Sequence, residues 1–210
     1  MKTPSASIRR QRSHEATIQT ILSTARAIMR EDGVAALSMH EIARRMDMRA
    51  PSLYNYFSGK MEIYDALFRL GFTLYDEHLT ELLKEAKDWH DELRIHIESY
   101  MSFAMKNPEL YQLCFERPVP GFVPSQESLA LSFGLLDRFQ RRARQQKKQL
   151  DTALSSDQIV NTVIAISHGI TAMHLSNEPE LPLGRGRFGS LIPVFLSLLE
   201  QAMPVKEAKK

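Results

Sequence analysis

The sequence predicts an all-α protein of about nine helices, and three observations support this class. Apolar residues recur at the spacing of a helix face along most of the 210-residue chain. Capping residues precede several of these runs, and Gly and Pro gather at the expected helix boundaries. We expect a flexible basic arm over residues 1–13, a three-helix domain over 14–60, a larger helical domain over 61–203 and a tail over 204–210.

The first helix is expected over residues 14–32 and should stop at Gly33, because glycine readily adopts the left-handed conformation that ends a helix. Its buried stripe consists of Ile18, Ile21, Leu22, Ala25, Ile28 and Met29. The arm before it is polar and carries Arg9, Arg10 and Arg12. Such a segment can be disordered alone and become ordered on nearby phosphates or in a minor groove.

Residues 38–60 are predicted to form two short helices joined by a tight turn. Ser38 and Glu41 make a capping-box pattern, in which the Ser hydroxyl accepts a first-turn N–H and the Glu side chain returns to the cap N–H. Leu53 and Phe57 are four residues apart and form the buried stripe of the second helix.

The side chains off that stripe are rich in donors, acceptors and flat rings. They are Arg49, Ala50, Ser52, Tyr54, Asn55 and Tyr56. A merely solvated helix more usually carries Glu and Lys, whereas this set suits phosphate oxygens and base edges. The alternative is a short packed hairpin with its aromatic residues in the core.

Charge and cysteine content narrow the class further. Residues 1–60 hold 10 Lys and Arg against 5 Asp and Glu, a net +5, whereas the remainder holds 17 against 20, a net −3. A basic end of this kind suits a DNA-facing surface. The single cysteine, Cys114, excludes an internal disulfide and is expected to be a buried apolar residue. We see no signal peptide and no run long enough to span a bilayer, so we expect a cytoplasmic protein with no membrane partner.

The segment from residue 14 to about 67 resembles the DNA-binding domain of the tetracycline-repressor (TetR) family of bacterial transcriptional regulators. The shared pattern is a first helix ending in Gly, a Ser-capped second helix and the ending Leu-Tyr-x-Tyr/His-Phe-x-x-Lys. The resemblance implies that residues 14–60 bind double-stranded DNA, with Ser38 and Met39 near the backbone and Lys60 on a phosphate. The positions that it implies face the groove or the phosphates are Arg49, Ala50, Pro51, Ser52, Tyr54 and Tyr56.

Two positions depart from the family's pattern. Asp47 stands where the turn usually has Gly, and Asp tolerates the left-handed backbone of a sharp turn. Arg49 stands where the recognition helix usually has a Ser or Thr cap, and Arg cannot accept a backbone N–H. We therefore expect this helix to start one residue away, with Asp47 as the acceptor and Arg49 as a free cation.

Helical patterns continue through the larger domain, separated by loops rich in Pro and Gly. The predicted helices span residues 58–86, 88–106, 107–116, 125–150, 155–176 and 190–203, with loops at 117–124 and 177–189. The stretch SYMSFAMKNPELYQLCF with the later ISHGITAMHL resembles the C-terminal domain of a TetR subgroup that carries a His-Gly (WHG-like) motif. The usual Trp before that motif is missing here, since Trp89 is the only Trp.

The last two helices, over about 156–176 and 190–203, are apolar on more than one face. A helix apolar most of the way round must be buried on several sides. Two such helices from each of two chains would pack as a four-helix interface, with Gly169 and Ala172 permitting close approach. We therefore predict a homodimer, which would match a palindromic operator. The alternative is that both helices are core helices of a monomer.

TetR-like bodies usually enclose a ligand pocket, and apolar and aromatic residues of this chain are candidates to line it. They are Phe72, Tyr75, Tyr100, Met101, Phe103, Tyr111, Phe115, His168 and Met173. Such a set suits an amphipathic or aromatic small-molecule effector. Plain core packing is the alternative for each of them.

Other chemistry is not indicated. The seven His residues show no metal-ligand spacing, no phosphate loop follows a strand, and no catalytic grouping is apparent, so we expect no metal, no cofactor and no enzyme. The basic run from Arg138 to Lys148 is interpreted as a solvated face. The hypothesis is a homodimeric repressor that releases a palindromic operator when a small molecule binds. The alternatives are a regulator without small-molecule input, an activator, or a helical enzyme or carrier with a vestigial hairpin.

Overall fold

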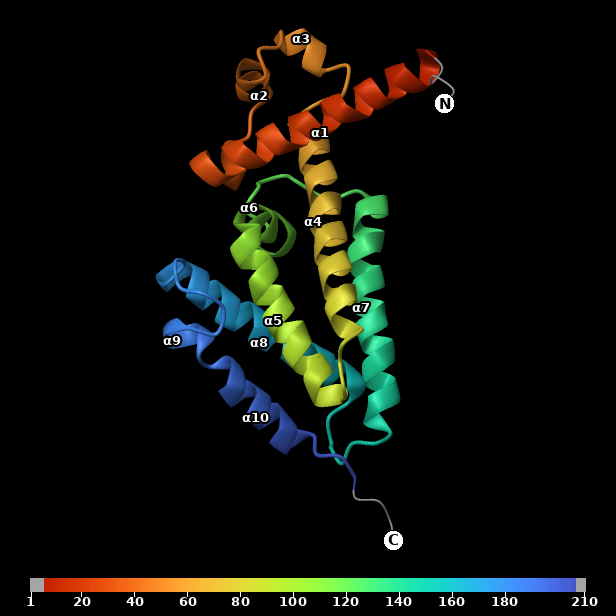
Figure 1. Cartoon of the computed structure of the whole chain (residues 1–210), viewed down its shortest axis with the longest axis vertical. Coiled ribbons are helices and arrows are strands. Elements are labelled where there is room, and N and C mark those ends of the chain that lie inside the picture. The colour runs from red at the N-terminus through yellow and green to blue at the C-terminus, as the bar shows by residue number, and fades with distance from the viewer. Residues whose placement is uncertain (1–5, 207–210) are drawn as a thin grey trace. The chain divides into compact units, whose positions relative to one another are not determined.

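A computed structural model of the chain, which describes residues 6–206, is helical throughout (Figure 1). This confirms the predicted all-α class. The only strand-like pairing in residues 6–206 is an isolated antiparallel bridge between Leu150 and Val205. The elements are α1 (Ala6–Asp32), η1 (Val34–Ala36), α2 (Met39–Arg45), α3 (Ala50–Leu53), α4 (Lys60–Leu83), α5 (Trp89–Lys106), α6 (Pro108–Tyr111), η2 (Gln112–Glu116), α7 (Gln126–Lys147), α8 (Ser156–Asn177), α9 (Gly186–Gly189) and α10 (Ile192–Ala202).

The chain divides into two compact units. The first unit holds the chain up to Gly71 together with Pro108–Ser128, and the second holds Phe72–Asn107 together with the chain from Leu129 onward. Helix α4 therefore contributes to both units. The predicted division lies near residue 60, whereas the first unit extends to Gly71 and also includes Pro108–Ser128.

Helix α1 begins at Ala6, eight residues before the predicted start at residue 14. Arg10 and Arg12 consequently lie exposed on a helix and not in a flexible arm. The apolar stripe starts only at Ile18, so the hydrophobic pattern gave no signal for the earlier turns. Residues 1–5 of the predicted arm and 207–210 of the predicted tail lie outside the described residues.

The core of the first unit is built on the stripe of α1. Ile21, Ala25 and Ile28 are fully or almost fully buried, as are Ile42 of α2 and Leu53 of α3. The loop after α1 is also fixed, because the Tyr64 hydroxyl donates to the Val34 carbonyl at 2.6 Å. Most of the free energy that holds these short helices together must come from this apolar burial.

A buried carboxylate joins α6 to α1 within the first unit. The side chain of Glu109 is completely inaccessible and accepts hydrogen bonds from Arg26 Nε at 2.7 Å and Arg30 Nε at 2.6 Å. A carboxylate removed from water is costly unless it is both charge-paired and hydrogen-bonded, and here it is both.

A second acidic group fixes the start of α7 in the same unit. Asp65 accepts from the backbone N–H of Ser125 at 2.7 Å and from the Ser128 hydroxyl at 2.8 Å. Burial would raise the pKa of Asp65, but these hydrogen bonds outweigh it and lower the pKa overall. Nearby, Cys114 packs its Sγ atom against the Phe68 carbonyl at 3.7 Å, and burial raises the pKa of its thiol.

The second unit is organised around α5, which contacts both α8 and α10. Trp89, Leu93 and Ile97 of α5 belong to its core, together with Ile159 of α8 and Ile192 of α10. The start of α8 confirms the predicted capping box, with Ser155 and Gln158 each bonded to the other's backbone N–H.

Contrary to the sequence expectation, α8 is long and apolar enough, by length and composition, to cross a membrane. In its most apolar window 39% of the helix is buried inside the structure, and core helices of ordinary globular proteins meet the same criteria. Helix α8 packs here against α5 and α9.

We predict that Glu109→Ala destabilises the protein by about 3 kcal/mol, because it leaves two arginines facing a buried gap with no carboxylate. Urea denaturation followed by circular dichroism measures the loss. Glu127→Gln is the matched control, since Glu127 is 81% exposed and pairs with Arg69 at the surface. A shift no larger than that of the control would contradict the structural role of Glu109.

Candidate nucleic-acid interface and ligand pocket

Helix α2 starts at a side-chain cap. The Ser38 hydroxyl accepts the backbone N–H of Glu41 at 3.1 Å, as the sequence predicted. The other half of the predicted capping box is replaced, because the Glu41 carboxylate binds two arginines and does not return to the cap. Arg44 donates to it through Nε at 2.8 Å and Nη2 at 2.7 Å, and Arg45 donates through Nε at 2.7 Å.

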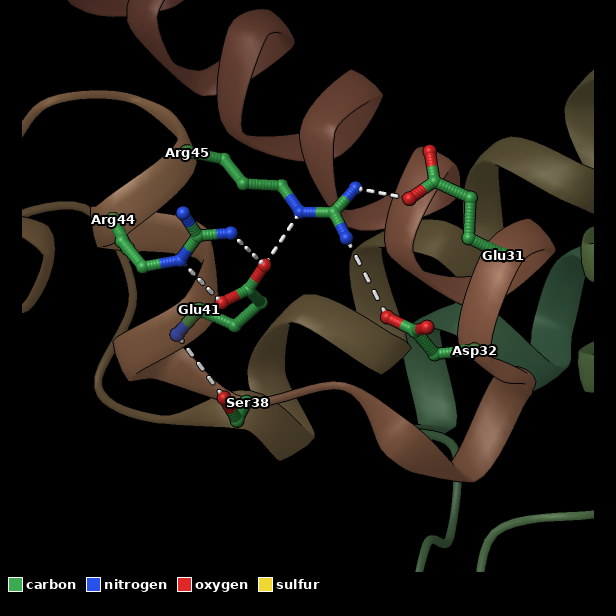
Figure 2. Close-up of polar contacts among 6 residues, drawn as sticks. All are labelled: Glu31, Asp32, Ser38, Glu41, Arg44 and Arg45. Carbon is green, nitrogen blue, oxygen red and sulfur yellow. Dashed lines mark hydrogen bonds and ion pairs between the residues drawn. The ribbon is translucent and has the colours of Figure 1, made fainter.

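Arg45 links α2 to the end of α1 (Figure 2). While its Nε binds Glu41, its Nη1 donates to Glu31 at 2.6 Å and its Nη2 approaches Asp32 at 3.4 Å. Hydrogen bonds from Arg44 and then Arg45 lower the pKa of Glu41 to about 2. The planar guanidinium thus fixes the angle between two helices through several bonds, which a lysine could not reproduce.

The turn after α2 uses a left-handed residue at the predicted position. Asp47 has φ 51°, and Met48 N–H donates to the Ala43 carbonyl at 2.9 Å. The prediction that Asp47 supplies the tight turn in place of Gly is therefore confirmed by the backbone. Its side chain does not cap α3 as expected, because the N-cap of that helix is Arg49.

Helix α3 is only four residues long, from Ala50 to Leu53, and Pro51 lies in its first turn. The Arg49 side chain makes no capping hydrogen bond, and the predicted shift of the helix start does not occur. Leu53 is fully buried and Phe57 is 6% exposed, so the predicted stripe does anchor this segment in the first unit.

The predicted DNA-facing residues fall into two groups on this surface. Arg49, Pro51, Tyr54, Asn55 and Lys60 are exposed, whereas Ser38, Met39, Ala50, Ser52 and Tyr56 are partly buried. The side chain of Tyr54 is 55% exposed.

Tyr56 is held against α1. Its ring stacks on His14 with centroids 4.9 Å apart and an angle of 22° between the ring planes. Neither His14 nor Arg44, whose side chain is 64% exposed, was among the predicted DNA-facing residues. Arginines three and four residues after an acid were a usable signal for the Glu41 ion pairs.

The surface so formed can donate and accept hydrogen bonds and can stack. The cations Arg44, Arg49 and Lys60 are exposed on this segment of the chain, as are the phenol of Tyr54 and the amide of Asn55. Guanidinium and ammonium groups suit phosphate oxygens, and amide and phenol groups suit base edges.

The predicted ligand-lining residues of the second unit are mostly core. The ring of Tyr75 contacts those of Tyr100 and Phe103, whose centroids are 5.9 Å and 5.3 Å away. The Tyr100 hydroxyl is 3.0 Å from Nδ1 of His168. Phe72 and Met101 are likewise buried.

The remaining candidates are scattered. Met173 is 46% exposed on the outer side of α8. Tyr111 and Phe115 belong to the first unit, where their rings lie 5.8 Å apart. The prediction that all nine residues surround one ligand stays a prediction.

A different pocket opens within the second unit, with a volume of about 240 Å³. Its lining comes from three helices, which are α4, α5 and α7. The lining residues are Asp76, Leu79, Thr80, Leu83, Glu92, His96, Leu135, Arg138, Phe139 and Arg142. None of these residues was predicted to face a ligand, and the two arginines belong to the run that the sequence analysis interpreted as a solvated face.

Two ion pairs are formed by residues that line this pocket. Arg142 donates to both carboxylate oxygens of Glu92, through Nε at 3.0 and 2.8 Å, and Arg138 binds Asp76. The first pair is the more buried, since the Glu92 side chain is only 12% exposed, whereas Asp76 is 38% exposed.

His96 contributes a neutral ring to the pocket. It stacks on Phe139 with centroids 3.8 Å apart and an interplanar angle of 20°. Burial lowers the pKa of His96 to about 4, so the imidazole carries no charge at neutral pH.

Comparison with known proteins bears on the first unit most directly. Residues 21–67 match the family model described as bacterial regulatory proteins of the tetR family. This range covers the end of α1, both helices of the hairpin and the start of α4, which are the elements that form the surface described above.

Sequence relatives include transcriptional regulators, and a solved structure shares the fold. The chain is 29% identical over 96 residues to the transcriptional regulator YobS of Bacillus subtilis and to the transcriptional activator FasR of Mycolicibacterium smegmatis. Each alignment covers 46% of this chain, and it covers 50% of YobS and 44% of FasR, so the chain spans about half the length of these relatives. The structure of FadR from Bacillus subtilis in complex with stearoyl-CoA superposes with a TM-score of 0.69 at 17% identity, over 86% of this chain and 96% of that one.

We predict that acidification destabilises the protein through His96. Its pKa is lower in the folded state than the usual 6.5, so its contribution to stability is complete above pH 6.5 and is lost as pH falls toward 4. Between these two pH values, the free energy of unfolding should fall by about 1.4 kcal/mol per pH unit because of His96. Denaturant titrations between pH 7.5 and 4.5 should show the stability difference between wild type and His96→Gln shrinking with acidity. His40→Gln, on the exposed side of α2, is the control, and parallel pH curves for wild type and His96→Gln would contradict this account.

Proposed function

We propose that the chain, whose residues 21–67 match the family model of tetR-type bacterial regulatory proteins, is a transcriptional repressor that binds a palindromic operator as a homodimer and is released by a small molecule. The observation that carries the proposal is the hairpin of α2 and α3, whose outer side presents exposed arginine, tyrosine and asparagine side chains. It lies within the range that matches the family model.

We assign the contacts with DNA from the exposure of the side chains on this surface. Tyr54 and Asn55 are assigned to base edges, and Arg49 and Lys60 to phosphates. Ser38, Met39, Ala50, Pro51, Ser52 and Tyr56 are assigned to the approach of the DNA backbone and to the packing of the helix that reads it. Arg10 and Arg12 on the first turns of α1 add positive charge that can act on nearby phosphates.

The dimer is assigned to α8 and α10. Both helices contact α5, and each also carries large apolar side chains that are exposed in the single chain. Ile164 and Met173 of α8 are 43% and 46% exposed, and Val194 and Leu198 of α10 are 52% and 53% exposed. Exposed apolar side chains on two neighbouring elements of the chain are a feature of interfaces between chains. A second copy would bury it and would place two reading heads on two half-sites of a symmetric operator.

Control by a small molecule is assigned to the second unit. The pocket of α4, α5 and α7 supports it, since it offers an apolar wall with a few polar groups. Helix α4 belongs to both units and is our candidate for the route of transmission. A ligand acts in this way only if it binds the DNA-free state more tightly than the DNA-bound state. We assign no catalytic activity to the chain, and we place the regulator in the cytoplasm, where its operator would be.

Activation of transcription is the second candidate function, and it is favoured by the likeness to FasR, which is described as an activator. A reporter gene driven by the operator-bearing promoter distinguishes the two. If the protein is a repressor, deleting its gene raises expression of the reporter. If it is an activator, the deletion lowers expression of the reporter.

We predict that the protein shifts a fragment from the DNA flanking its own gene in a gel assay, and that binding weakens steeply with salt. Tyr54→Ala should weaken specific binding by about tenfold or more, which is the usual loss for a base contact. Lys60→Gln should weaken binding to all sequences and reduce the salt slope by about one.

Lys84→Gln is the matched control, because Lys84 is 62% exposed in the second unit and pairs with Glu81. Circular dichroism should show each variant folded. Specific binding that survives both Tyr54→Ala and Lys60→Gln would contradict the proposed interface.

We predict that Val194→Glu converts the dimer to a monomer in analytical ultracentrifugation, because it places a charge in the apolar surface that a second copy would bury. Val123→Glu is the control, since Val123 is 79% exposed in a loop of the first unit. A wild-type protein that is monomeric at micromolar concentration would overturn the assignment.

A further inference from the structure

We propose that the pocket between α4, α5 and α7 binds a compact apolar organic acid, whose carboxylate takes the guanidinium of Arg138. That this acid acts as the effector rests on the proposed function. That it binds in the pocket does not depend on the proposed function. The pocket lies wholly in the second unit, and its residues come from positions 76–83, 92–96 and 135–142.

The apolar residues that line the pocket indicate that most of the ligand is apolar. Leu79 and Phe139 are 3% and 7% exposed, and Leu83 and Leu135 complete the wall. A volume of about 240 Å³ holds roughly a dozen non-hydrogen atoms at the packing density of protein interiors. That is far smaller than stearoyl-CoA, the ligand in the FadR complex, so a long-chain acyl-CoA does not fit this pocket as it stands.

The pair of Arg142 with Glu92 is closed to a ligand. Both oxygens of Glu92 already accept from Arg142. The amide oxygen of Gln146, turned to face the guanidinium, accepts from Nη2 and Nη1 of Arg142 at 2.7 and 2.8 Å. Opening this pair would strand a carboxylate that is only 12% exposed, which is costly.

The pair of Arg138 with Asp76 can open at little cost. Arg138 is 48% exposed and Asp76 is 38% exposed, and ion pairs this accessible contribute little. Only Nη2 of Arg138 is engaged within the described part of the chain, and a guanidinium carries five N–H donors. When a ligand displaces Asp76, that carboxylate keeps solvent and the Thr80 hydroxyl, which donates to it at 3.3 Å.

The unused donor capacity at the pocket belongs mainly to Arg138. Three of the four oxygens of Asp76 and Glu92 already accept, whereas Arg138 retains most of its N–H groups. The neutral imidazole of His96 makes no hydrogen bond to another described side chain and adds one further N–H. Donors beside an apolar wall recognise an anion with an apolar body, and an arginine fork favours a carboxylate.

Three probes of nearly equal size and shape test the charge. They are 2-naphthoate, 2-naphthamide and 2-naphthamidine, which are anionic, neutral and cationic. Isothermal titration of the full chain should show 2-naphthoate binding about tenfold more tightly than the amide, the usual value of a hydrogen bond to a charged group. Arg138→Gln should reduce binding of the acid to the level of the amide.

Arg141→Gln is the matched control, because Arg141 lies on the same helix, is 61% exposed and pairs with Asp137 outside the pocket. It should leave the affinity for 2-naphthoate unchanged. Tightest binding of the amidine, equal binding of the acid by wild type and Arg138→Gln, or no binding of any probe would each overturn the proposal. A gel shift on the same preparations separates this inference from the proposed function. If the protein binds its operator but not the acid, only the inference is refuted. If it binds the acid but no operator, only the proposed function as a DNA-binding repressor is refuted.

Discussion

A helix of four residues cannot hold its own shape, and this constraint governs the first unit. Helix α3 makes too few internal hydrogen bonds to be stable alone, so its neighbours must fix its position. The buried side chains of Leu53 and Phe57 anchor it in the core of the first unit. The stacking of Tyr56 on His14 connects the segment after α3 to α1. The frame itself is set by Arg45, which joins α2 to the end of α1. The surface proposed for DNA is therefore as well ordered as this frame.

The buried stripe and the turn of the hairpin were predictable because they depend on local chemistry. The left-handed backbone at Asp47 belongs to a tight turn, which a short stretch of sequence can indicate. The same holds for the capping box at Ser155, which formed completely. At Glu41 the equivalent box formed by half, because arginines three and four residues later offer its carboxylate stronger partners than a backbone N–H. Local patterns thus fail where several partners compete for one side chain.

The pocket was not predictable, for a different reason. It brings together helices separated by dozens of residues, and its ion pairs join Asp76 to Arg138 and Glu92 to Arg142. Each of these residues looks like ordinary solvated charge in the sequence. The aromatic residues that did look like a ligand site pack on one another, as Tyr75 does with Tyr100 and Phe103. Helical spacing identifies which residues turn inward, and it carries no information about where packing leaves space.

The separation of anchoring and exposed positions in residues 49–57 has an evolutionary consequence. Leu53 and Phe57 carry the burial, whereas Arg49, Tyr54 and Asn55 contribute little to the core. Surface substitutions away from buried groups usually change stability by only a few tenths of a kcal/mol. Duplicated copies of such a gene can therefore exchange these exposed residues freely, and their recognition can diverge while the fold that carries it stays equally stable.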